Sequence, residues 1–196
     1  MNYTIATFYN RISFLYPAIS CFLARQRRTL INEVNKMNPG NLLEIGVGNG
    51  SHLPLYASHQ VTGIDVSETM LKKARRYAGC DTKLLLMNGE SLLFAKNSFD
   101  YVVMSHVLAV TEDHDKLLEQ VYRVLKPGGK LFVLNHFTPD NLLKYIDMAF
   151  HPFSSLLHFK SLFYLKDVSG LKMFTLVSQT GQGIGSYFKL LIYSKP

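Results

Sequence analysis

The sequence predicts a single α/β domain, residues 1–196, with a Rossmann-like, doubly wound and mostly parallel sheet of seven strands. Short apolar runs alternate with helical patterns, an order that gives parallel strands joined by crossover helices. Several runs end in an acidic residue or lead into glycines, and ligands bind at the carboxyl ends of such strands. A chain of 196 residues with 47% hydrophobic content is large enough for one full core.

Residues 12–24 form an uncharged apolar run, and a basic segment with helical spacing follows it. The run is shorter than the roughly 20 residues that span a bilayer, and Pro17 interrupts it. Its positive charges come mainly after the run, whereas a secretory signal places them before. Apolar residues continue at helical spacing up to Val34. Three arginines lie mostly off this stripe: Arg25, Arg27 and Arg28. We expect residues 1–38 to form a helical lid that contacts a membrane surface, or alternatively a helix packed on the domain with its arginines solvated.

The strand-like runs are rich in β-branched and aromatic residues. They cover residues 41–45, 61–65, 82–87, 99–104 and 129–135. One helix is expected from the Ser67 cap to Gly79, and another from Thr111 to the Pro127–Gly129 stop. The final segment, 172–196, has two strand-like runs with a glycine-containing connection, which predicts an antiparallel C-terminal hairpin at one edge of the sheet.

The formal charge of +7 and the isoelectric point of about 9.4 favour an anionic partner, either a nucleic acid or an anionic membrane face, unless the charge only aids solubility. The two cysteines, outside any CxxC pattern, favour a reduced, cytoplasmic compartment.

The stretch "NLLEIGVGNGSHLPLY", residues 41–56, poses the question of what its glycine-rich turn binds. It lacks the GxxxxGK[ST] pattern of phosphate-binding loops, and Ser51 replaces the third glycine of the dinucleotide fingerprint GxGxxG. Glu44, just before the turn, would repel a phosphate but attract an ammonium group. The turn glycines are Gly46, Gly48 and Gly50. Together these residues indicate S-adenosylmethionine, which carries an ammonium and a sulfonium but no phosphate.

Further candidate cofactor residues follow the next strands. Asp65 ends its strand where a carboxylate can accept both ribose hydroxyls, and Met70 can lie against the adenine or simply belong to the helix core. Asn88, with the backbone around it, can read the adenine edge. The remaining expected cofactor contacts are Val66, Gly89, Glu90, Ser105 and His106.

Four segments in order resemble the motifs of the class I S-adenosylmethionine-dependent methyltransferases. They are ExGxGxG, "GIDVSETMLKKAR", "NGESLLFAKNSFD" and "VLKPGGKLFV", spanning Asn41 to Asn135. The resemblance implies methyl transfer with S-adenosylhomocysteine as the product. Asn88 stands where the family usually has Asp, so we expect weaker cofactor binding rather than its loss.

The remaining segments resemble the soluble bacterial phosphatidylethanolamine N-methyltransferases. They are Tyr9 to Tyr16 before the basic helix, "LPLY" at 53–56, and "NHF" at 135–137. The resemblance implies a phospholipid substrate, methylated toward phosphatidylcholine, and peripheral attachment to the inner membrane face. An aromatic-rich insertion, residues 138–170, would then lie on the substrate side.

An ethanolamine-type amine has a pKa near that of lysine, ~10.4, so a proton must leave before it can attack. His136 and His106 follow strand ends and are candidate acceptors, although His106 better suits a shape-filling place near the cofactor. Tyr9 and Tyr16 could orient the head group. Four basic residues could bind the lipid phosphate: Arg25, Arg27, Arg28 and Lys160. No metal is expected, because the seven histidines show no HxxH-type spacing with a nearby acid.

Three other functions are considered. A quinone-precursor C-methyltransferase would share most cofactor motifs. A nucleic-acid amine methyltransferase would carry an N/D-PP-Y/F motif where this chain has "SHVLAV", so no nucleic-acid partner is expected. A non-catalytic cofactor- or lipid-binding module is disfavoured by the intact motif residues Glu44 and Asp65. The sequence does not indicate an oligomeric state.

Overall fold

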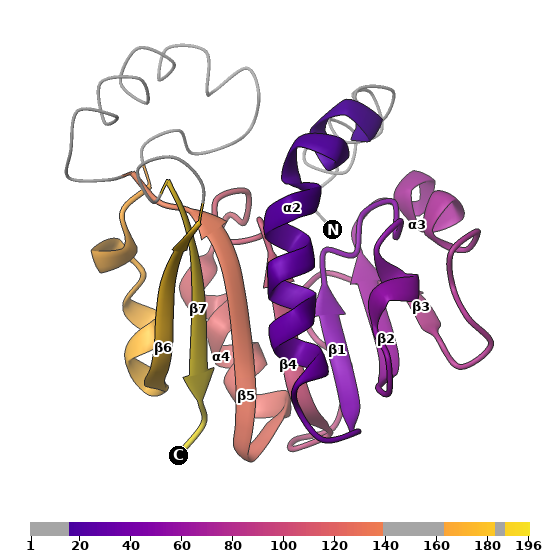
Figure 1. The fold of residues 1–196 in the computed structure, drawn as a ribbon. Coiled ribbons are helices and arrows are strands. Elements are labelled where there is room, and N and C mark those ends of the chain that lie inside the picture. Colours follow the sequence, from indigo (N-terminus) through magenta and orange to yellow (C-terminus); the bar gives the residue numbers. More distant parts are fainter. Residues whose placement is uncertain (1–15, 139–162, 183–186) are drawn as a thin grey trace.

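The computed structural model describes residues 16–138, 163–182 and 187–196, with side chains of the first helix described from Leu23 onward. Seven strands form one sheet in the order β3-β2-β1-β4-β5-β7-β6 (Figure 1). The strands are β1 (Asn41–Ile45), β2 (Gln60–Asp65), β3 (Lys83–Leu86), β4 (Phe99–Ser105), β5 (Leu125–His136), β6 (Thr175–Gln182) and β7 (Phe188–Ser194). The first five pair in parallel, and β7 is antiparallel to both β5 and β6. The predicted sheet and its C-terminal hairpin are therefore confirmed.

Side chains alternate between the two faces of the sheet, and each face carries its own hydrophobic cluster. Helices α2 (Tyr16–Asn35) and α3 (Glu68–Ala74) cover one face, while α4 (His114–Val124) and the short helix η3 (Ser169–Met173) cover the other. Two more 3₁₀ turns are η1 (Leu53–Leu55) and η2 (Leu165–Asp167). Because α2 and α4 pack on opposite faces, the central strands are buried on both sides, as their apolar sequences require.

Helix α2 packs on the sheet through its C-terminal half. Leu30, Ile31 and Val34 are at most 1% exposed and lie in the same cluster as residues of β1, β4 and β5. Arg25 and Arg28 are exposed, but Arg27 is only 7% exposed and points inward. The three arginines therefore do not form one solvated face, because Arg27 follows Leu23 and precedes Ile31 by one helical turn each. Among the described helices, none has the length and hydropathy to cross a membrane.

The chain departs from regular strand–helix alternation in two places, and one helix ends earlier than expected. Only the three-residue turn η1 follows the glycine loop, and no helix occurs between β3 and β4. Helix α4 ends at Val124 rather than at the Pro127–Gly129 stop, because the next residue, Leu125, already belongs to β5 and pairs with Phe99 of β4. The Pro-Gly-Gly segment is instead an irregularity inside β5, where Gly128 has a φ of 74°.

Candidate cofactor and substrate site

The glycine turn lies at the carboxyl end of β1, where the sequence predicted the cofactor. Gly46, Gly48 and Gly50 all have positive φ values, of 73°, 58° and 68°. A Cβ atom on Gly46 would lie 2.7 Å from Val107 Cγ2, and one on Gly50 would lie 2.6 Å from Ala74 Cβ. Conformation and space together therefore require glycine at both ends of this turn.

The turn does not open a regular helix. The chain passes from Gly50 into η1, which has three residues. A dinucleotide site of the Rossmann type places the pyrophosphate at a helix N-terminus directly after the glycines, and this chain has only a single turn there. The geometry agrees with the sequence interpretation that the loop does not bind a pyrophosphate.

Asp65 connects the end of β2 to the glycine turn. Its Oδ2 accepts a hydrogen bond from the Gly48 N–H at 2.8 Å, and its Oδ1 accepts one from the Ser67 N–H at 2.9 Å. Burial raises the pKa of the Asp65 carboxyl, while these backbone hydrogen bonds oppose the rise. Each carboxylate oxygen keeps a further lone pair. Asp65 can therefore accept two ribose hydroxyl protons while it holds the turn in place.

Glu44 is buried near the end of β1, 1% exposed, beside His52, which is 5% exposed. Glu44 Oε1 lies 2.6 Å from His52 Nε2, whereas Oε2 is buried and has no hydrogen-bond partner among the described residues. Tyr56 lies next to this pair, and burial, the charge of Glu44 and a hydrogen bond to its carboxylate raise the pKa of the Tyr56 hydroxyl well above the usual value. A buried carboxylate with an oxygen still available at this edge of the sheet fits an ammonium group.

His52 was missed at the sequence level. It is a lone histidine outside any metal-ligand or catalytic spacing, so no pattern marked it. One signal could have identified His52: it stands two residues after the last turn glycine. The turn folds the chain back over the end of β1, so a residue at this position lies near Glu44.

The expected adenine-binding residues lie between β2 and the start of α4. Met70 is 1% exposed and packs within α3. Asn88 Oδ1 accepts a hydrogen bond from the Glu90 N–H at 2.9 Å, so the amide oxygen already serves the local turn. Gly89 is buried, and a Cβ atom there would lie 2.7 Å from Leu117 Cδ1. Val66 is half-buried in the turn after Asp65.

The ends of β4 and β5 carry a second group of buried polar side chains. Ser105 Oγ, His106 Nε2 and Asn135 Oδ1 have no hydrogen-bond partner among the described residues. His106 has a φ of 61°. Burial, Arg27 and His136, in that order, lower the pKa of His106 to about 3. His106 is therefore a neutral imidazole at physiological pH.

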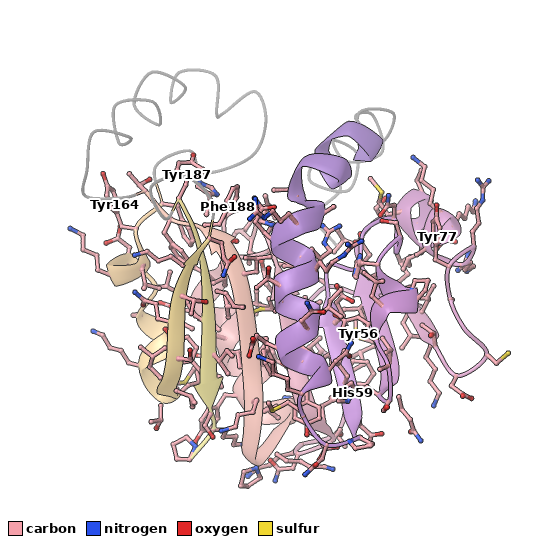
Figure 2. The ribbon with its side chains drawn as sticks, in the orientation of Figure 1. Tyr56, His59, Tyr77, Tyr164, Tyr187 and Phe188 are labelled. Carbon is pink, nitrogen blue, oxygen red and sulfur yellow. The ribbon has the colours of Figure 1, made fainter. Side chains whose placement is uncertain are left out.

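Aromatic rings surround these histidines. The His136 ring stacks on Tyr187 with centroids 5.6 Å apart, and the His106 ring meets Phe188 edge-on at 5.4 Å. Phe163 lies 6.5 Å from the His136 ring. Figure 2 shows Tyr187 and Phe188 close together at the end of the sheet where β5 terminates. Sequence reasoning did not select Tyr187 or Phe188, because their place beside β5 arises only from the antiparallel pairing of β7.

Some predicted residues are not placed by the structure. Tyr9 and Lys160 lie outside the described residues, as do the side chain of Tyr16 and most of the insertion, residues 139–162. Within the described ranges, no three His, Cys, Asp or Glu side chains are arranged to hold a metal ion.

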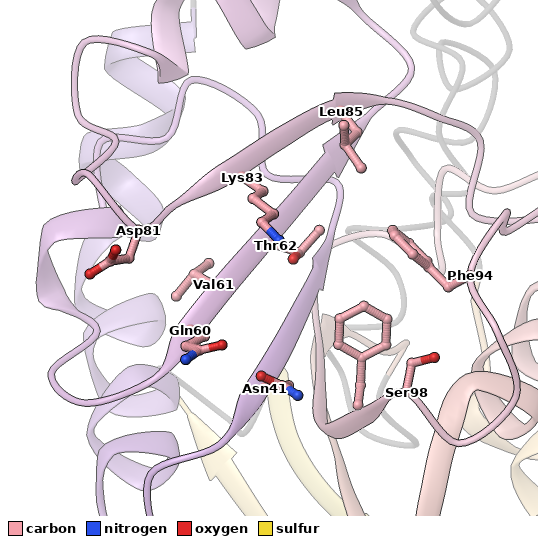
Figure 3. A pocket seen from close by; sticks show the side chains of 10 residues that line it. Asn41, Gln60, Val61, Thr62, Asp81, Lys83, Leu85, Phe94 and Ser98 are labelled. Carbon is pink, nitrogen blue, oxygen red and sulfur yellow. The ribbon is translucent and has the colours of Figure 1, made fainter.

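A separate groove of about 320 Å³ lies near the amino ends of β1 to β4 (Figure 3). Asn41, Thr62, Lys83 and Phe94 are among its lining residues. Because Glu44 and Asp65 stand at the other ends of their strands, this groove does not belong to the candidate site.

Comparisons with known proteins agree with the geometry. The family model for the methyltransferase domain matches residues 43–133. The chain is 33% identical over 177 residues to a phosphatidylethanolamine N-methyltransferase of Cereibacter sphaeroides, covering 86% of each chain. It is also 33% identical over 132 residues to a ubiquinone/menaquinone biosynthesis C-methyltransferase of Desulfotalea psychrophila, covering 65% of this chain and 54% of that protein.

The fold is shared with a solved structure of Haemonchus contortus phospholethanolamine N-methyltransferase 2, in complex with phosphomonomethylethanolamine and S-adenosylhomocysteine. The TM-score is 0.78 at 18% identity, covering 100% of this chain and 61% of that one.

Replacing Asp65 with alanine is expected to weaken S-adenosylhomocysteine binding about 100-fold, because two hydrogen bonds to a charged group are lost at about 1.5 kcal/mol each. Isothermal titration calorimetry measures this change. Asp81→Ala, at an exposed carboxylate before β3, is the control and should bind as the wild type does. Equal affinities for the two variants would remove Asp65 from the site. In the wild type, the ionised carboxylate is the accepting form, so affinity should fall as pH decreases through the raised pKa of Asp65.

Proposed function

The chain belongs to the class I S-adenosylmethionine-dependent methyltransferases, and from this premise we propose that it N-methylates phosphatidylethanolamine and its mono- and dimethyl forms toward phosphatidylcholine. The observation that carries the proposal is the extent of one similarity. The match to the phosphatidylethanolamine N-methyltransferase covers 86% of both chains and so includes the segments outside the cofactor motifs. Substrate recognition resides in those segments, because the cofactor motifs are common to the family.

The aromatic rings at the ends of β5 and β7 support an amine substrate. Tyr187, Phe188 and Phe163 surround His136 and His106 at ring distances between 5.4 and 6.5 Å. Aromatic faces attract alkylammonium groups, and successive methylation makes the head group a better partner for such faces. This wall lies on the same edge of the sheet as Glu44 and Asp65, where the methyl group must arrive.

The two histidines have different roles in this proposal. Bound S-adenosylmethionine supplies an electrophilic methyl group. His106 is a very weak base, because burial and the Arg27 charge lower its pKa to about 3, and it therefore shapes the site. His136, buried at the end of β5 and stacked on Tyr187, is the proposed acceptor of the amine proton. The other contribution of the chain is alignment of the amine with water excluded.

The basic residues also divide into two kinds. Arg27 is buried, and its charge acts on both Tyr56 and His106. It therefore lies between the group around Glu44 and the group of histidines at the ends of β4 and β5. We propose Arg27 as the cation for an anionic group inside the site, such as the lipid phosphate. Arg25 and Arg28 are exposed and are the proposed contacts with an anionic membrane surface from the cytoplasmic side.

Methylation of a quinone precursor is the alternative substrate class. Several relatives at 33–39% identity are ubiquinone/menaquinone biosynthesis C-methyltransferases, and this chain spans about half the length of most of them. Such a reaction needs a base for an aromatic hydroxyl, and His136 has the position for that role too. The two substrates must therefore be tested side by side.

The deciding assay follows the methyl group of radiolabelled S-adenosylmethionine into lipid. We expect label in mono-, di- and trimethylated lipids when vesicles contain phosphatidylethanolamine, and none when they contain only phosphatidylglycerol. Thin-layer chromatography of the extract separates these products. A parallel reaction contains a demethylated quinone precursor. Label in the quinone and not in the lipid would reject the proposal in favour of the alternative.

His136→Gln is expected to lower the transfer rate by at least about 100-fold, since a positioned proton acceptor contributes roughly 10²–10⁴-fold. Binding of S-adenosylhomocysteine should be unchanged. The control is His59→Gln, which should keep the wild-type rate. His59 lies away from the site, and its Nε2 is 3.2 Å from the Val34 carbonyl oxygen. A His136→Gln enzyme with normal turnover would show that the proton leaves by another route.

Replacing Arg25 and Arg28 together with alanine should weaken binding to vesicles containing phosphatidylglycerol about 30-fold, at about 1 kcal/mol for each basic residue. The effect should diminish at high salt. Cosedimentation measures it. The matched control removes the same charge at Lys83 and Lys96, exposed residues near the amino ends of the strands. If both double variants bind equally well, α2 is not the docking surface.

A further inference from the structure

We propose that His52 is a positioning residue that holds Glu44 for the ammonium group of the cofactor. The two side chains are 5% and 1% exposed, and His52 Nε2 lies 2.6 Å from Glu44 Oε1. The inference concerns cofactor binding, so it holds for a lipid or a quinone substrate alike.

The hydrogen-bonding pattern fixes where the proton of His52 lies. A carboxylate oxygen can only accept, so Nε2 donates to Glu44 Oε1. His52 Nδ1 is also buried and has no partner among the described residues. The ring is therefore tied to Glu44 through Nε2, and Nδ1 makes no competing hydrogen bond to the described residues.

The hydrogen bond from His52 occupies Oε1 and orients the carboxylate plane. Oε2 has no partner of regular hydrogen-bond geometry among the described residues, and the Tyr56 hydroxyl beside it is close enough for Glu44 to raise its pKa. The imidazole thus fixes the orientation of the carboxylate that we propose for the ammonium group.

Other charged and titratable groups around the pair are consistent with this arrangement. Tyr56 keeps its proton, because burial and Glu44 raise the pKa of its hydroxyl. Arg27 approaches from α2, and its charge acts on Tyr56. The Glu44 charge is also felt at Asp65, where it adds to the effect of burial in raising the carboxyl pKa. A positively charged group bound at Glu44 would reduce this repulsion.

The His52 ring is held by its neighbours. It meets the Tyr56 ring edge-on with centroids 6.2 Å apart, and it is the N-cap of η1, which begins at Leu53 and has Pro54 as its second residue. In Figure 2, Tyr56 lies on the same connection as His59, the histidine that can serve as a control. His59 packs edge-on against Tyr101 at 5.1 Å and hydrogen-bonds to α2 instead of to Glu44.

The test compares two ligands that differ in the amino-acid part. S-adenosylhomocysteine carries the ammonium, and 5′-methylthioadenosine lacks it but keeps the adenine and ribose. Calorimetry should show that His52→Phe binds S-adenosylhomocysteine about tenfold more weakly, as expected for the loss of one hydrogen bond to a charged group, while 5′-methylthioadenosine binding is unchanged. His52→Gln should recover most of the lost affinity, because its amide N–H can reach the same carboxylate oxygen.

His59→Phe is the matched control and should leave both affinities at wild-type values. Equal weakening of both ligands by His52→Phe would show a merely structural role for the histidine and would overturn the proposal. The proposal would also be overturned if His52→Phe bound S-adenosylhomocysteine as tightly as the wild type does, or if His52→Gln bound it as weakly as His52→Phe does. None of these measurements uses a methyl acceptor, so failure of the lipid assay and failure of this inference are distinguishable.

Discussion

The burial of a carboxylate at the end of the central strand is the constraint on which the site depends. An ionised carboxyl group loses several kcal/mol of hydration when it is taken out of water without compensation. Glu44 has β2 and β4 on either side and helices on both faces, so water cannot provide that compensation. The chain brings His52 back to it by a turn that only positive-φ glycines can make, and Tyr56 follows beside the pair. The same turn places Gly48 against Asp65, so the residues proposed for the ammonium group and for the ribose are held by a single backbone conformation.

Much of this architecture could be predicted because its signals are local. Strand periodicity, a Ser67 cap and glycines after an acidic strand end each act over a few residues, and they located Glu44, the glycine turn and Asp65. The parts that could not be predicted depend on contacts between distant segments. The end of α4 is set by the pairing of Leu125 with Phe99, and this tertiary pairing overrides the proline and glycines that follow.

Arg27 was selected from the sequence but its burial was not foreseen, whereas His52 was not selected at all. Arg27 lies four residues from both Leu23 and Ile31, so the periodicity of α2 predicted that it faces the sheet. Its charge, however, favoured an exposed position. His52 has no periodic signal, and its importance comes from a partner eight residues earlier across the turn. Tyr187 and Phe188 belong to a third kind, since they reach the site only through the antiparallel return of β7 beside β5.

The two histidines at adjacent strand ends illustrate how environment separates identical side chains. His106 stands at the end of β4 near Arg27, and His136 stands one strand away against Tyr187. Burial, more than the nearby charge of Arg27, makes His106 a poor base, whereas His136 lies among stacked rings. A fold that presents both at one edge can place a shape-filling histidine and the proposed proton acceptor within the same small site.

The left-handed backbone at His106 has a consequence for how this protein can change over evolution. A non-glycine residue at a φ of 61° stores about 1 kcal/mol of strain that glycine would release. Selection for thermal stability alone would favour glycine at this position, and that change would remove an imidazole from the wall of the candidate site. In the proposed role of His106, stability and activity therefore pull in opposite directions at this position.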